Sequence, residues 1–70
     1  MLTGTRIAFI GGGNMAEALL AGLLRKGVAA AEHLTVSDPD VHRRALLAER
    51  FGVAVHADNR TAAHGAELVV

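Results

Sequence analysis

Residues 7–24 decide the fold of this chain, and they read Ile-Ala-Phe-Ile-Gly-Gly-Gly-Asn-Met-Ala-Glu-Ala-Leu-Leu-Ala-Gly-Leu-Leu. Four apolar residues lead into three glycines, and an apolar pattern of helical period follows them. This order predicts a strand, a tight turn and a helix. Dinucleotide-binding folds hold a pyrophosphate at such a turn, because the glycines admit the phosphates and the start of the helix attracts an anion.

The turn has a physical reason for each small residue. Gly11 ends the strand and can adopt backbone angles that a residue with a Cβ resists. Gly13 offers no side chain, so a phosphate can approach the main chain there. Ala16 takes the place of the third glycine in the Gly-x-Gly-x-x-Gly pattern and lets the helix lie close to the strand. The alternative is a glycine-rich turn that binds nothing, and the strand and helix around it favour the nucleotide site.

The composition limits the classes of function. Seventy residues form at most one small domain, and seven basic against seven acidic residues give no net charge. That balance argues against binding to nucleic acid or to an anionic membrane. No apolar run is long enough to span a bilayer, so we expect a soluble protein of the cytoplasm.

Catalytic and metal-binding side chains are not evident in the sequence. The absence of cysteine excludes a disulfide, a thiolate nucleophile and a cysteine-type zinc site. The four histidines do not share a metal-ligand spacing with a third ligand beside them. No nucleophile–base pair or carboxylate dyad stands out either. We therefore predict a binding signature with no catalytic residue and no metal site in this chain.

The first helix is expected over residues 14–26. Asn14 is placed to cap its N-terminus, and Gly27 is placed to end it. An apolar stripe of helical period is expected to face the sheet, with Gly22 allowing a close approach. Its members are Met15, Ala18, Leu19, Gly22 and Leu23, and Leu20 and Leu24 widen it.

Further elements alternate along the chain. Strands are expected over residues 6–10, 34–37, 53–55 and 67–70. A second helix is expected over 41–51, and a short third one, capped by Asp58 or Asn59, reaches about His64. The inward residues of the second helix are expected to be Val41, Ala45, Leu46, Leu47 and Ala48.

This alternation predicts an α/β fold. We expect a Rossmann-like parallel sheet of order 3-2-1-4 with helices on both faces, which is the first half of a doubly wound domain. The fourth strand would then expose an apolar edge. That edge suggests either a truncated piece of a longer enzyme or a small domain that associates with itself.

Asp38 follows the second strand and stands twenty-two residues beyond Ala16. This offset is close to that of the acidic residue that hydrogen-bonds a ribose hydroxyl in dinucleotide-binding folds. Asp38 followed by Pro39 also fits the N-cap and first residue of the next helix, and Asp38 and Asp40 could divide the two roles. If the ribose carried a 2′-phosphate, Arg43 or Arg44 would be in reach of it, although surface arginines are the plainer interpretation.

The glycine turn and the residues after it resemble the N-terminus of the pyrroline-5-carboxylate reductase family. That family opens with an apolar strand, Gly-x-Gly, then Asn or Gln, Met or Leu, and a small residue. The likeness continues through the rest of the chain in the family's usual order, over Gly22, Gly27-Val28, Val36-Ser37-Asp38-Pro39, Phe51-Gly52-Val53, Asp58-Asn59 and 66–70.

The resemblance implies a set of cofactor-binding residues. The backbone around the turn would line the pyrophosphate, through Ile10, Gly11, Gly12, Gly13, Asn14 and Met15. Asp38 would contact the adenosine ribose or its 2′-phosphate, and Asn59 would contact the cofactor on the same side. Members that favour NADPH commonly carry serine or another neutral residue in place of Asp38. The acidic side chain therefore leaves NADP(H) and NAD(H) both open as cofactor.

The resemblance also implies an activity. Members of the family reduce the cyclic imine 1-pyrroline-5-carboxylate to L-proline with a hydride from NADPH or NADH, a step of proline biosynthesis. We expect residues 1–70 to be the truncated N-terminal NAD(P)-binding domain, without the helical substrate and dimerisation domain. The chain alone would then be inactive, and the full-length enzyme would be a homo-oligomer that binds a small imine.

Three alternatives remain at this point. A hydroxyacid or 6-phosphogluconate-type dehydrogenase has a similar turn, but usually with Met directly before a glycine, whereas Ala16 follows Met15 here. A nucleotide-binding module without chemistry of its own is the second. The third is an interaction protein that associates through its fourth strand.

Overall fold

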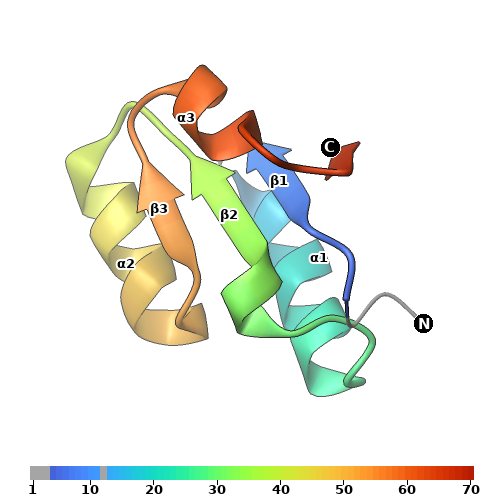
Figure 1. Cartoon of the computed structure of the whole chain (residues 1–70). Helices are drawn as coiled ribbons and strands as arrows, with labels where there is room; N and C mark the ends of the chain where they lie inside the picture. The colour runs from blue at the N-terminus through green and yellow to red at the C-terminus, as the bar shows by residue number, and fades with distance from the viewer. Residues whose placement is uncertain (1–3, 12) are drawn as a thin grey trace.

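A computed structural model describes residues 4–11 and 13–70, and within them a four-stranded sheet carries helices on both faces (Figure 1). Strands and helices alternate along the chain as expected. In order they are β1 (Ile7–Ile10), α1 (Asn14–Arg25), the 3₁₀ turn η1 (Ala31–His33), β2 (Leu34–Ser37), α2 (Val41–Phe51), β3 (Ala54–His56), α3 (Asn59–Ala63) and β4 (Leu68–Val69).

The sheet confirms the predicted order, which is β3-β2-β1-β4 with every neighbouring pair parallel. In the register of β1 with β2, Ile7 lies beside Leu34 and Ile10 lies beside Ser37. The Rossmann-like α/β prediction is therefore confirmed. Only the bounds shift slightly: β3 begins one residue later than expected, and β4 is confined to two residues.

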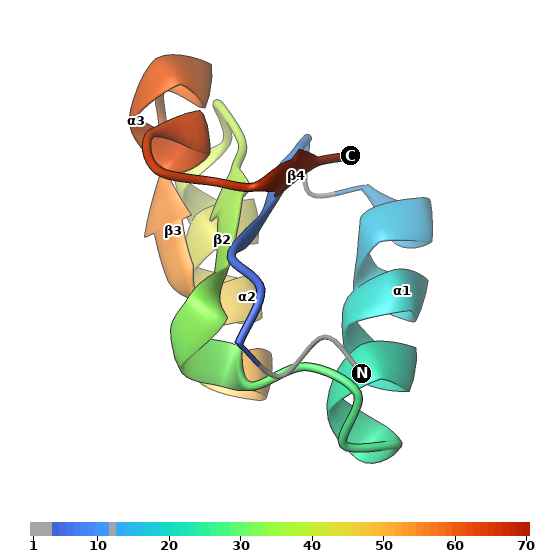
Figure 2. The same cartoon turned by 45° about the vertical axis from the view of Figure 1, so that its right-hand side comes forward.

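The helices form two layers around the sheet, and this explains why β1 is apolar on both of its faces. In Figure 2, α1 lies on one side of the sheet and α3 on the other. Ile7 and Phe9 belong to the core that also includes residues of α1 and α2. Ala8, fully buried, lies beside Thr35, whose hydroxyl reaches α3 at the carbonyl of Ala62. A strand covered on both faces needs apolar residues at every position.

The buried face of α1 agrees with the predicted stripe at Leu20, Leu23 and Leu24 and differs from it at Met15 and Leu19. Ala16 and Leu20 are buried, and Leu23 and Leu24 pack partly against the core. Met15 and Leu19, expected inside, expose 77% and 43% of their surface. Adjacent leucine pairs make the helical period compatible with either face, so the periodicity alone did not distinguish the buried residues from Met15 and Leu19.

Two further packing predictions are wrong. A Cβ built at Gly22 finds no atom of the described residues within 4 Å beyond its own helix backbone and chain neighbours, so no close approach explains this glycine. In α2, Leu47 is buried, but Val41 exposes 58% of its surface and Ala45 is also exposed. The helix ends are as expected, because Gly27 and Gly52 take positive φ angles of 67° and 69°.

Candidate functional site

The carboxyl ends of the parallel strands form one edge of the sheet, and the predicted site residues follow them there. Three backbone hydrogen bonds join the segments that leave the strands. Gly11 N–H donates to the Ser37 carbonyl at 2.8 Å, Asp38 N–H to that of His56 at 3.0 Å, and Ile10 N–H to that of Val70 at 2.9 Å. The structure therefore brings the glycine turn and Asp38 to the same edge. Open α/β sheets bind their ligands at this edge.

The glycines of the turn differ in backbone conformation. Gly11 has a φ of 89°, a conformation that side-chain-bearing residues rarely adopt. Gly13 has φ −73° and ψ −173°, which any residue can adopt. A Cβ built on Gly13 meets no described atom within 4 Å apart from its chain neighbours. Neither backbone strain nor internal packing requires glycine at that position. Gly12 lies outside the described residues.

The three α-helices begin at this edge, and their N-termini are capped differently. Asp40 caps α2 by accepting from His42 N–H at 2.9 Å, and Asp58 caps α3 by accepting from the N–H groups of Arg60 and Thr61. At α1 the N-cap is Gly13, and no side chain of the described residues caps it. The predicted capping by Asn14 is wrong, because Asn14 is the first helical residue. The first N–H groups of α1 lack an intrahelical acceptor.

The structure shows that Asp40, and not Asp38, caps α2. Asp40 is the N-cap of α2, so Pro39 lies before the helix. The Asp38 carboxylate accepts from Asp40 N–H through Oδ1 at 2.8 Å. Asp38 thus closes a tight turn of its own, two residues before α2 begins, and it is partly buried at the edge of the sheet.

The two candidate arginines have separate partners. Arg44 donates through Nη1 to the Asp38 carbonyl at 2.7 Å, which places its guanidinium beside the end of β2. Arg43 donates through Nη2 to Glu17 Oε2 at 3.1 Å, and Arg50 donates to the other oxygen of Glu17. Glu17 therefore connects α1 to α2, and Arg43 serves that connection. Arg44 binds the main chain of Asp38.

Asn59 is the first residue of α3, and its side chain is held by a residue that sequence reasoning missed. Ser37, fully buried at the end of β2, donates from Oγ to Asn59 Oδ1 at 2.5 Å. The only signal in the sequence is a serine at the end of a short strand that also contains the buried Leu34 and Val36. Beside it, the hydroxyl of Thr61 and then the backbone N–H of Arg60 lower the pKa of the Asp58 carboxyl.

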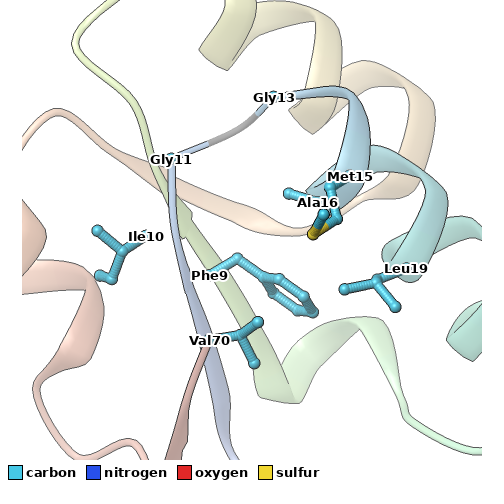
Figure 3. Close-up of a pocket in the computed structure, with 8 residues that line it drawn as sticks. All are labelled: Phe9, Ile10, Gly11, Gly13, Met15, Ala16, Leu19 and Val70. Carbon is cyan, nitrogen blue, oxygen red and sulfur yellow. The ribbon is translucent and has the colours of Figure 1, made fainter.

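An apolar pocket of about 280 Å³ opens beside the glycine turn (Figure 3). Phe9 and Val70 form its sheet wall, and the side chain of Leu19 points toward them from α1. Ile10 also borders the pocket but points the other way, and Met15 is exposed at the rim. The volume is at the lower end of the range for drug-sized ligands, so this pocket holds at most part of a dinucleotide.

Residues 4–11 and 13–70 form neither a metal-ligand cluster nor a membrane-spanning helix. No group of three or more metal-ligating side chains comes together there. None of the helices in the same ranges is long and apolar enough to cross a membrane.

Comparison with known proteins identifies the family. Residues 6–70 match the family model described as NADP oxidoreductase, coenzyme F420-dependent. The chain belongs to this family. Among curated proteins it is 46% identical over 65 residues to a pyrroline-5-carboxylate reductase of Pseudomonas aeruginosa, and 47% identical over 64 residues to one of Haemophilus influenzae. These alignments cover 93% and 91% of the chain.

A solved structure supports the same relationship. The pyrroline-5-carboxylate reductase of Coxiella burnetii superposes with a TM-score of 0.87 at 34% identity, over 93% of this chain and 24% of that one. The chain spans 23% of the length of each of the two sequence relatives. The resemblance seen in the glycine turn and the segments after it is therefore confirmed over nearly the whole chain.

Proposed function

We propose that this chain binds NADH or NADPH across the carboxyl edge of its sheet. The pyrophosphate lies at the N-terminus of α1, and the adenosine ribose lies toward Asp38 and Asn59. The single observation that carries the proposal is the difference in capping: the N-caps of α2 and α3 are aspartates whose side chains accept from N–H groups of the first turn, whereas the N-cap of α1 is Gly13. A phosphate oxygen can accept the N–H groups that no described side chain caps at α1, and the helix dipole favours its charge.

The turn fits this ligand on steric grounds as well. Gly13 is in a conformation open to any residue, and the space beside it is free of described protein atoms. The absence of a side chain there leaves that space to a ligand that approaches the backbone closely. Gly11 has the complementary task, because its positive φ turns the chain sharply from β1 toward α1. We include Ile10, Gly12, Asn14 and Met15 in this pyrophosphate site.

The choice between the two cofactors depends on Asp38 and Arg44. A carboxylate accepts a hydrogen bond from the free 2′-hydroxyl of NADH and repels the 2′-phosphate of NADPH. Arg44, held 2.7 Å from the Asp38 carbonyl, supplies a positive charge at the same place. We assign any interaction with a 2′-phosphate to Arg44, since Arg43 is engaged with Glu17 in the link between α1 and α2.

We further propose that the chain is the N-terminal cofactor-binding part of a pyrroline-5-carboxylate reductase. When bound, the nicotinamide supplies the hydride that reduces the imine carbon of 1-pyrroline-5-carboxylate, giving L-proline. The residues of this chain bind and orient the cofactor, which fixes the hydride donor against the imine. The substrate contacts and the helical dimerisation domain belong to the part of the relatives that lies beyond the alignment. We place the full-length homo-oligomeric enzyme in the cytoplasm.

Calorimetric titration of the folded chain with NADH and NADPH tests the proposal. We expect saturable binding of at least one nucleotide, together with shifts of the amide resonances of Gly11, Gly13 and Asn14. A folded chain that binds neither nucleotide would contradict it. ATP serves as a control: it carries adenosine and phosphates but no nicotinamide half, and we expect weaker binding.

A further inference from the structure

Ser37 is the buried polar residue of the core, and its hydroxyl has a defined task. Among the described residues it is the one polar residue that is fully buried. Its Oγ donates to Asn59 Oδ1 at 2.5 Å across twenty-two residues of sequence. A buried hydroxyl without a partner would be costly, so this bond satisfies Ser37. It also fixes Asn59, which is exposed at the start of α3.

The bond determines which group Asn59 presents at the edge of the sheet. A carboxamide carries one acceptor oxygen and one NH₂ group with two donor hydrogens. Because the oxygen accepts from the buried hydroxyl, the NH₂ group is the end that is left to meet a ligand. Asn59 therefore presents donors, and donors suit the oxygen atoms of a ribose or a phosphate.

We propose that Ser37 is a positioning residue for the cofactor, which holds the Asn59 amide so that its NH₂ group donates to the adenosine half of the dinucleotide. This inference rests on the proposed nucleotide site. Without the serine hydroxyl the amide is free to rotate or flip, and an oxygen would face the ligand for part of the time. Ordering the Asn59 amide on binding then costs conformational entropy, and this lowers the affinity for the nucleotide.

The chain contains a matched control two residues earlier on the same face of β2. Thr35 donates from Oγ1 to the Ala62 carbonyl at 2.8 Å, so it also joins β2 to α3 by one side-chain hydroxyl. Its bond ends on the backbone of α3, away from Asn59. Removing this hydroxyl in Thr35→Val weakens the docking of α3 as Ser37→Ala does, but leaves the Asn59 amide in place.

The experiment measures NADH and NADPH affinities of wild type, Ser37→Ala, Thr35→Val, Asn59→Ala and the Ser37→Ala/Asn59→Ala double variant, with urea denaturation of each. We expect Ser37→Ala to weaken binding about three- to tenfold, the effect of one hydrogen bond. We expect Thr35→Val to bind as wild type although its stability also falls. The double variant should bind no more weakly than Asn59→Ala, because the serine acts through the asparagine.

A second measurement follows Ser37 and Asn59 without nucleotide. In the free wild-type chain, the Asn59 side-chain NH₂ group should be ordered on the picosecond-to-nanosecond timescale, and Ser37→Ala should lower its ¹⁵N order parameter. Additive losses in the double variant, or unchanged affinity in Ser37→Ala, would overturn the positioning role. If wild type is folded and binds neither nucleotide, the proposed function fails and this role fails with it, whereas wild-type binding with unchanged Ser37→Ala affinity removes this role alone.

Discussion

An added methyl group is predicted to lower the stability of the fold at Gly11 and the affinity for nucleotide at Gly13. Gly11 has a φ of 89°, so Gly11→Ala places an L-residue in a left-handed conformation. That strain costs roughly 1–2 kcal/mol, and the loss of flexibility in the unfolded chain returns about 0.4–1 kcal/mol. We expect a net destabilisation of about 1 kcal/mol, or a Tm about 4–8 °C lower for a domain of this size.

Gly13→Ala should leave the stability nearly unchanged. The backbone of Gly13 is extended, and the new Cβ meets no described atom within 4 Å beyond the chain neighbours. Alanine is a poorer N-cap than glycine, but it restricts the unfolded chain, and these two effects are of similar size. The methyl group does occupy the space that we assign to the phosphate. We therefore expect nucleotide affinity to fall at least about tenfold, which corresponds to about 1.4 kcal/mol.

Calorimetric titration with NADH and thermal denaturation of both variants make the comparison. Gly52→Ala is the control for strain, because Gly52 has a φ of 69° at the C-terminus of α2, away from the glycine turn. It should lose stability as Gly11→Ala does and retain the affinity of wild type. Wild-type affinity in Gly13→Ala would refute the close approach of a phosphate, and a stability loss in Gly13→Ala as large as in Gly11→Ala would refute the reasoning from backbone angles.

Three further predictions concern the charged residues around the site. Arg44→Gln should weaken NADPH binding about five- to tenfold in calorimetry and leave NADH unchanged, whereas equal effects of Arg43→Gln would contradict the assignment. Asp40→Ala should cost about 1 kcal/mol in urea denaturation, because α2 loses its cap. The pKa of Asp58 is lowered in the folded chain, so its contribution to stability is present at neutral pH and is lost as the pH falls below about 4. In Asp58→Asn the free energy of unfolding should therefore depend less steeply on pH in the acid range. An unchanged slope would contradict this contribution of Asp58.

The strand order was predictable because it depends on local patterns that parallel sheets constrain strongly. Continuous apolar runs such as β1 indicate strands covered on both faces, and connections with a fixed handedness then leave few possible orders. The buried face of α1 was not predictable in this way. Leu19 and Leu20 are adjacent, so either can begin an apolar stripe, and the direction in which the helix leaves the turn decides between them.

The candidate site shows the same difference between local signals and contacts that depend on the fold. Gly11 and Gly13 act through their own backbone, and the local sequence was sufficient to predict a tight turn between strand and helix there. Ser37 and Asn59 act through a contact between segments that meet only because β2 lies between β1 and β3, with α3 packed across the sheet. A single serine at the end of a strand carries no information about its partner. The fold must be known first, and the hydrogen bond between Ser37 and Asn59 can then be recognised.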